Sequence, residues 1–135
     1  MSILTWSEDF SINVAEIDAQ HKTLLKHVSD LHAAVKAQID KEELRQMLVE
    51  LVDYTRFHFS TEERLMAENG LENVDTHRIE HRVLLKYMEG LVDGVSKGNY
   101  PTFYSDYDIA DDWFLNHILN FDKKLGDYLN SKGVY

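Results

Sequence analysis

The sequence predicts an all-α protein, an antiparallel up-and-down four-helix bundle with a non-helical N-terminal arm. Three observations favour this fold. The 135 residues contain one proline and six glycines, which leaves long stretches free of helix breakers. Four of these stretches carry apolar residues at steps of three and four, the period of an amphipathic helix. Most connections between them are short, which favours antiparallel neighbours packed in a bundle.

The chain is predicted to begin with an arm, because residues 1–16 show no helical period. The apolar residues of this arm are expected to pack on the outside of the bundle; they are Trp6, Phe10 and Ile12. The first helix is predicted over residues 17–35, where the apolar stripe begins at Ile17 and ends at Val35.

The second helix is predicted over residues 44–66. Asp40 is a residue type that caps helix N-termini, and Glu43 three residues later completes the pattern of a capping box. Gly70 is the expected stop, because glycine readily adopts the left-handed conformation in which many helices end.

The third helix is predicted over residues 77–95, ending near Gly94 and Gly98, and the fourth over residues 110–129, ending near Gly133. The stretch between them holds the single proline of the chain and several tyrosines. It is therefore predicted to be a loop, the one long connection of the bundle.

Composition limits the classes of function. The length suits a single domain over residues 1–135, without room for a fused partner domain. A formal net charge of -10 argues against nucleic acid and anionic membranes as partners, because phosphate groups require a basic surface. The chain has no cysteine, no signal-peptide pattern and no apolar run long enough to span a bilayer. These features predict a cytoplasmic protein that is not inserted in a membrane.

Histidines and carboxylates interrupt the apolar stripes of all four predicted helices. They are His21, His58, Glu62, His77, His81, His117 and Asp122. A single core histidine is more often a hydrogen-bonded packing residue than a metal ligand. A bundle core cannot hold seven such groups cheaply, because each buried polar group without a partner costs about 1–3 kcal/mol. Metal ions at the centre would give every one of them a partner.

The spacing of these residues fits shared metal ions. A step of four residues turns an α-helix by about 400°, so the pairs His58/Glu62 and His77/His81 each lie on one helix face. His117 and Asp122 are five residues apart, and a local π-bulge would bring them onto one face.

Imidazole and carboxylate ligands suit iron, zinc, copper or manganese. The zinc-protease spacing H-E-x-x-H and the Glu-x-x-His motif of ferritin-like di-iron proteins are both absent from the chain. Seven ligands are too many for one tetrahedral ion and suit two ions, with Glu62 and Asp122 bridging and the histidines terminal.

The ordered series resembles the hemerythrin family over residues 21–122. It comprises His21, His58-x-x-x-Glu62, His77-x-x-x-His81 and His117-x-x-x-x-Asp122, together with DAQH at residues 18–21 and Trp113 one turn before His117. The resemblance implies two iron ions that alternate between Fe2+ and Fe3+, joined by an oxo or hydroxo bridge. It also implies that one iron is held by three histidines, namely His77, His81 and His117. The other iron would be held by His21 and His58 and would bind dioxygen.

The same resemblance implies an apolar dioxygen pocket lined by Leu24, Phe59, Trp113 and Ile118, with Leu119 as a further candidate. Apolar residues at helical spacing are core residues by default, and both roles are compatible. His27 and His32 are expected to be ordinary surface or boundary residues. Three further residues are expected on solvated faces, with hydrogen bonds to the ligand imidazoles as the alternative; they are Asp18, Gln20 and Glu80.

The implied function is reversible dioxygen binding, for oxygen storage, delivery or transport, by a protein that is not an enzyme. Dioxygen is the expected partner, together with a protein that receives the oxygen. Two alternatives stay open at this point. One is a module that senses oxygen, redox state or nitric oxide, and the other is an enzyme that handles iron or peroxide. The lack of a fused output domain favours the carrier over the sensor.

Overall fold

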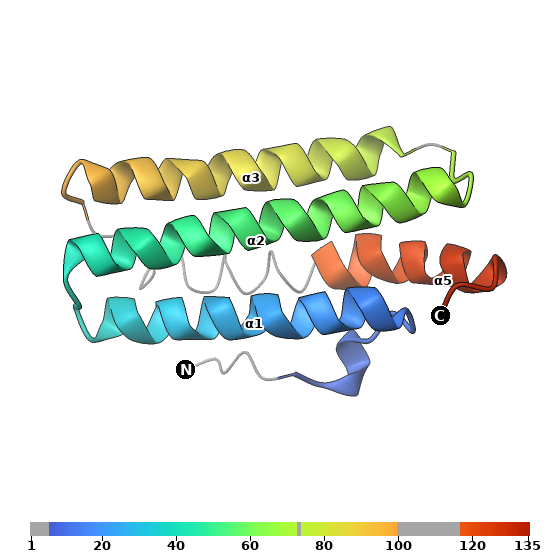
Figure 1. Cartoon of the computed structure of the whole chain (residues 1–135), viewed down its shortest axis with the longest axis horizontal. Helices are drawn as coiled ribbons and strands as arrows, with labels where there is room; N and C mark the ends of the chain where they lie inside the picture. Colours follow the sequence, from blue (N-terminus) through green and yellow to red (C-terminus); the bar gives the residue numbers. More distant parts are fainter. Residues whose placement is uncertain (1–5, 73, 100–116) are drawn as a thin grey trace.

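The computed structural model describes residues 6–72, 74–99 and 117–135 (Figure 1). Its elements, in chain order, are η1 (Glu8–Phe10), α1 (Ala15–Lys36), α2 (Lys41–Glu68), α3 (Asp75–Ser96), η2 (His117–Asp122) and α5 (Lys123–Ser131). η1 is a 3-10 turn, whereas η2 is a π-helix that runs directly into α5. The predicted loop around Pro101 and the first part of the predicted fourth helix lie outside the described residues.

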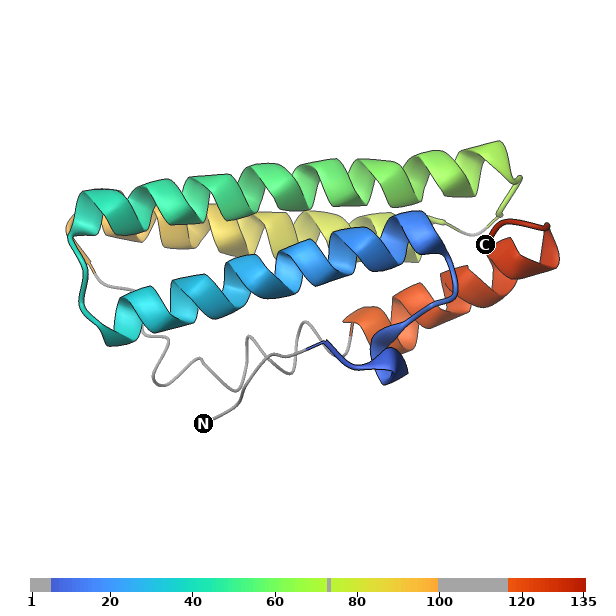
Figure 2. The ribbon, with the colours of Figure 1, turned by 60° about the horizontal axis from the view of Figure 1, so that its bottom comes forward.

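The long helices run alternately up and down the molecule. α1 and α2 pack side by side, as do α2 and α3. α5 contacts α2, and its chain direction is opposite to that of α1 (Figures 1 and 2). η2 and α5 together form the described part of the fourth helix. This arrangement confirms the predicted all-α antiparallel bundle.

The helix ends follow the signals in the sequence. The Asp40 side chain accepts hydrogen bonds from the backbone N–H groups of Glu42 and Glu43 and so caps α2. Beyond the other end of α2, Gly70 has a φ of 67°, and Gly98 after α3 has a φ of 92°. Both angles lie in the left-handed region that glycine adopts without strain.

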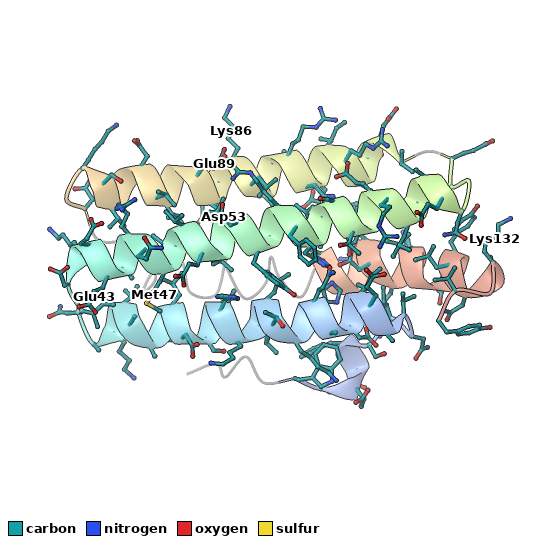
Figure 3. The ribbon with its side chains drawn as sticks, in the orientation of Figure 1. Glu43, Met47, Asp53, Lys86, Glu89 and Lys132 are labelled. Atoms are coloured by element: carbon teal, nitrogen blue, oxygen red, sulfur yellow. The ribbon has the colours of Figure 1, made fainter. Side chains whose placement is uncertain are left out.

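Apolar stripes of the helices meet in one core, whose largest fully buried apolar side chains are Ile17, Leu31, Leu44, Leu48, Met66 and Leu129. Burying such a side chain contributes about 1.5–3 kcal/mol. On the solvent-exposed side of the α2–α3 interface, the Arg56 side chain forms an ion pair with Glu89, and its Nη1 atom lies 3.9 Å from Asp53 Oδ1. Figure 3 labels both acidic residues. Over the described part of the chain, no helix combines the length and apolar character that crossing a membrane requires.

The arm differs from its prediction in two ways. It contains the 3-10 turn η1, which Ser7 caps by accepting from the backbone N–H of Asp9, so it is not wholly non-helical. Ile12 is buried in the core, whereas the expectation placed it on the outside of the bundle. Trp6 and Phe10 pack as expected, partly buried against that core.

Candidate metal centre

The five histidines and two carboxylates that interrupt the apolar stripes lie close together inside the bundle. They come from four elements: His21 from α1, His58 and Glu62 from α2, His77 and His81 from α3, and His117 and Asp122 from η2. All seven are buried, and both carboxylates have an exposed fraction of 0 %. The helices therefore bring together side chains as far apart in the sequence as His21 and Asp122, which are 101 positions apart.

The π-helix explains how His117 and Asp122 share this site. In an α-helix, a step of five residues would turn them about 140° apart. η2 begins at His117 and ends at Asp122, and the wider i→i+5 repeat of a π-helix brings these two residues onto one face. The imidazole Nε2 and the carboxylate Oδ1 are 3.2 Å apart. The predicted π-bulge is confirmed.

One oxygen of each carboxylate faces the group formed by His77, His81 and His117. Glu62 Oε1 is 2.9 Å from His81 Nε2 and 3.3 Å from His77 Nε2. Asp122 Oδ1 is 3.2 Å from both His77 Nε2 and His117 Nε2. Every imidazole of this group therefore directs its Nε2 atom toward the carboxylates.

The other carboxylate oxygens face the remaining two histidines. Glu62 Oε2 is 3.1 Å from His58 Nε2, and Asp122 Oδ2 is 2.9 Å from His21 Nε2. Potential ligand atoms thus form two compact groups, one of Glu62, His77, His81, His117 and Asp122, the other of His21, His58, Glu62 and Asp122. The two groups share both carboxylates, each through a different oxygen.

This donor set fits metal cations. Two ligand atoms about 2.1 Å from one ion and at right angles to each other lie about 3.0 Å apart, close to the spacings in both groups. Glu62 Oε2 and both oxygens of Asp122 are buried and make no hydrogen bond of normal geometry within the described residues. Buried carboxylate oxygens of this kind are stabilised when a cation is placed between them and the imidazoles.

The electrostatics of the metal-free protein also favour a bound cation at this site. Burial lowers the pKa of His21 and His77, but close contacts with the carboxylates of Asp122 and Glu62, and the negative charges of both, outweigh it and raise each pKa to about 9. For His117 the charge of Asp122 is the main opposing cause, and the pKa rises to about 10. Burial raises the carboxylate pKa values, yet the histidines hold the pKa of Glu62 and of Asp122 below its ordinary value. The cluster therefore attracts positive charge.

Two polar side chains outside the predicted ligand set contact it. Gln20 is buried and its Oε1 is 2.8 Å from His58 Nδ1, so the expectation of a solvated Gln20 is wrong. Glu63 Oε2 is 2.9 Å from His81 Nδ1, a contact that sequence reasoning missed. Asp18 instead holds the arm, accepting from the Ser11 hydroxyl and the Ile12 backbone N–H.

Two of the five predicted pocket residues can be placed. Leu24 is buried on α1, one turn after His21. The Phe59 ring stacks on His81 with 3.7 Å between centroids and 6° between planes. Trp113 lies outside the described residues, as do the side chains of Ile118 and Leu119 in η2.

Aromatic packing also includes a ring that the pocket prediction left out. The Phe121 ring lies 5.7 Å from the rings of both His77 and His117. The remaining histidines stay outside the cluster as expected, and His27 packs against Tyr54 at 5.6 Å between centroids.

Residues 13–129 match the family model described as "Hemerythrin HHE cation binding domain". The chain is 31% identical over 132 residues to a protein named bacteriohemerythrin from Methylococcus capsulatus, covering 97% of this chain and 100% of that protein. It is 29% identical over 119 residues to a protein named myohemerythrin from Theromyzon tessulatum, covering 88% of each chain.

Solved structures give the same result for the fold. A wild-type hemerythrin crystal structure aligns with a TM-score of 0.85 and 31% identity, covering 95% of this chain and 98% of that one. The crystal structure of a hemerythrin mutant aligns with the same TM-score and 32% identity, covering 96% and 98%. Because the family model spans most of the chain and the fold agrees, the chain belongs to the hemerythrin family.

Proposed function

We propose that this protein binds dioxygen reversibly at a non-heme di-iron centre and serves as an oxygen carrier, for storage or delivery. The observation that carries the proposal is the division of the two shared carboxylates. Glu62 and Asp122 each direct one oxygen to His77 and its neighbours and the other oxygen to the pair His21 and His58. Two ions with two carboxylates between them would use all of these atoms.

In this proposal, His77, His81 and His117 would hold one iron, and His21 and His58 would hold the second. Glu62 and Asp122 would each offer one oxygen to each iron, and the family resemblance adds an oxo or hydroxo group. When bound, the iron pair supplies the electrons on which reversible dioxygen binding depends. The chain offers one histidine fewer to the second iron, so that side would keep a position for an exogenous ligand.

The surrounding residues would exclude water from that open side. Leu24 follows His21 by one turn, and Phe59 follows His58 directly, so both can form the apolar wall of a dioxygen pocket. We also assign Trp113, Ile118 and Leu119 to this wall, from the family resemblance. A dry wall favours carrier function, because water and protons promote loss of bound dioxygen as superoxide or peroxide.

Binding and release fit the donor set better than catalytic turnover does. Five imidazoles, which bind metal in their neutral form, and only two carboxylates would surround the proposed ions. Fewer anionic ligands stabilise highly charged iron less, so the centre is poorly suited to the high-valent states that oxygen-activating enzymes use.

The test is an optical cycle on iron-loaded protein. The reduced protein should be nearly colourless, gain visible charge-transfer absorption under air, and lose it again when oxygen is removed with argon. A matched sample of Glu62→Ala, which lacks a shared carboxylate, should show no reversible absorption. A wild-type protein that bleaches under air or stays coloured under argon would contradict the carrier function.

A further inference from the structure

His58 on α2 and His81 on α3 each direct their Nδ1 atom away from the cluster, and the two Nδ1 atoms have chemically different hydrogen-bond partners. His58 Nδ1 lies 2.8 Å from Gln20 Oε1, an oxygen of a neutral amide. His81 Nδ1 lies 2.9 Å from Glu63 Oε2, an oxygen of a carboxylate. Since His58 and His81 belong to different ligand groups, the two proposed metal subsites differ in the charge that supports them.

On the His58 side, a buried chain of hydrogen bonds fixes the amide. The Thr61 hydroxyl donates to the Phe57 carbonyl at 3.1 Å, so its oxygen is left to accept from Gln20 Nε2, also at 3.1 Å. The Gln20 carbonyl oxygen must then face His58, whose Nδ1 carries the proton. As a result, the Nε2 lone pair of His58 is held toward Glu62.

On the His81 side, the partner carries a negative charge. A carboxylate can only accept, so His81 Nδ1 donates to Glu63 and its Nε2 lone pair points into the cluster. The other oxygen of Glu63 lies 3.6 Å from Arg78 Nε, an ion pair without a hydrogen bond. Charge-assisted hydrogen bonds are roughly twice as strong as neutral ones and raise the basicity of a ligating imidazole.

We propose that Glu63 and Gln20 are positioning residues that make the two metal subsites unequal. Glu63 strengthens the subsite of His77, His81 and His117, so that this subsite fills first and its iron is the more easily oxidised. Gln20 orients His58 without adding charge and leaves the subsite of His21 and His58 the weaker of the two. This inference rests on the proposed di-iron function.

The experiment is a titration of metal-free protein with cobalt(II), followed by visible absorption in competition with a chelator. Wild-type protein should bind two ions in two steps, and His21→Ala should abolish the weaker step. Glu63→Gln keeps an acceptor but removes the charge, and should lower the association constant of the tighter step by about tenfold, within the range known for such outer partners. Gln20→Glu should instead raise the constant of the weaker step.

Glu80→Gln is the matched control, because Glu80 directly precedes His81 but makes no hydrogen bond or ion pair with a histidine of the cluster in the described structure. It should leave both constants unchanged. A second readout is the reduction potential of the iron-loaded protein, which should rise in Glu63→Gln and fall in Gln20→Glu. A purely structural effect of these isosteric changes would not produce opposite shifts.

The outcomes separate the two levels of the proposal. If Glu63→Gln behaves like Glu80→Gln, or weakens both steps equally, the inequality of the subsites does not come from Glu63, while the two-ion centre stands. If wild-type protein binds a single cobalt ion, the di-iron proposal fails and this inference fails with it.

Discussion

Leu24 and Leu31 are both buried on α1, but only Leu24 lies one turn from a residue of the cluster, His21. Leu24→Ala should retain both irons and speed autoxidation, because the shorter side chain admits water to the proposed pocket. Leu31→Ala should cost about 2–5 kcal/mol of stability without changing the autoxidation rate. Iron analysis and the decay of the oxygenated spectrum measure both effects, and loss of iron in Leu24→Ala would show that the pocket is misplaced.

His77 and His27 provide a second comparison at the residue scale. His77 Nε2 lies within 3.3 Å of both carboxylates, whereas His27 packs on Tyr54 outside the cluster. His77→Ala should bind fewer than two irons per chain, since it removes a ligand from the three-histidine subsite. His27→Ala should keep two irons. Equal iron contents in the two variants, measured after identical loading, would contradict the ligand assignment.

The spacing of apolar residues along each helix was enough to find the seven cluster residues, because each of them interrupts an apolar stripe. It failed for Gln20 and Glu63, which adjoin cluster residues and resemble ordinary polar-face positions. Gln20 is buried through its contact with Thr61 on α2, and Glu63 reaches His81 on α3. Such contacts depend on how neighbouring helices dock, which the pattern of one helix does not encode.

At the scale of the elements, the close packing of the N-terminal arm against α5 requires a glycine at position 126. A Cβ at Gly126 would overlap the carbonyl oxygen of Ile12 and come within 2.8 Å of the Ile12 Cβ. Because the nearest atom is backbone, Gly126→Ala should displace the arm and lower the free energy of unfolding by about 1–3 kcal/mol. Chemical denaturation measures this change.

The control for this prediction is Gly90→Ala on α3. In the described structure, a Cβ at Gly90 meets no atom within 4 Å. The substitution should therefore stabilise the protein by about 0.5–1 kcal/mol through helix propensity alone. Stabilisation by Gly126→Ala as well would mean that the arm does not pack against α5 in solution.

The element boundaries show what local sequence signals can predict. Asp40, Gly70 and Gly98 act within one turn of the helix ends that they mark, and the structure confirms all three positions. The arm depends on contacts that are distant in sequence, since Asn130 on α5 donates to the carbonyl of Asn13. For that reason, the burial of Ile12 could not be predicted from residues 1–16.

At the scale of the whole molecule, the metal-free protein should depend on pH in a defined direction. The pKa values of His21 and His77 rise from 6.5 to about 9, and that of His117 to about 10. A raised histidine pKa contributes stability that is fully present below pH 6.5 and is lost as the pH rises through the folded value. The thermal midpoint of metal-free protein should therefore fall between pH 6.5 and about 10.

The stability of the metal-free protein should also fall at acidic pH. Glu62 has a pKa well below its ordinary value of 4.5, so its contribution is present above that pH and is lost as the pH falls. Iron-loaded protein should have a higher midpoint, and that midpoint should change little between pH 6.5 and 9, because metal ions replace the protons on the histidines. Identical midpoints and pH profiles for the two forms, in thermal scans across this range, would contradict a metal-centred core.

The central claim is that the two carboxylates serve two ions at once. A crystal structure of the iron-loaded protein, with anomalous scattering recorded at the iron edge, tests it most directly. We expect two iron peaks per chain, both contacting Glu62 and Asp122, with His77, His81 and His117 at one peak and His21 and His58 at the other. A single peak, or two peaks that do not share these carboxylates, would contradict the account.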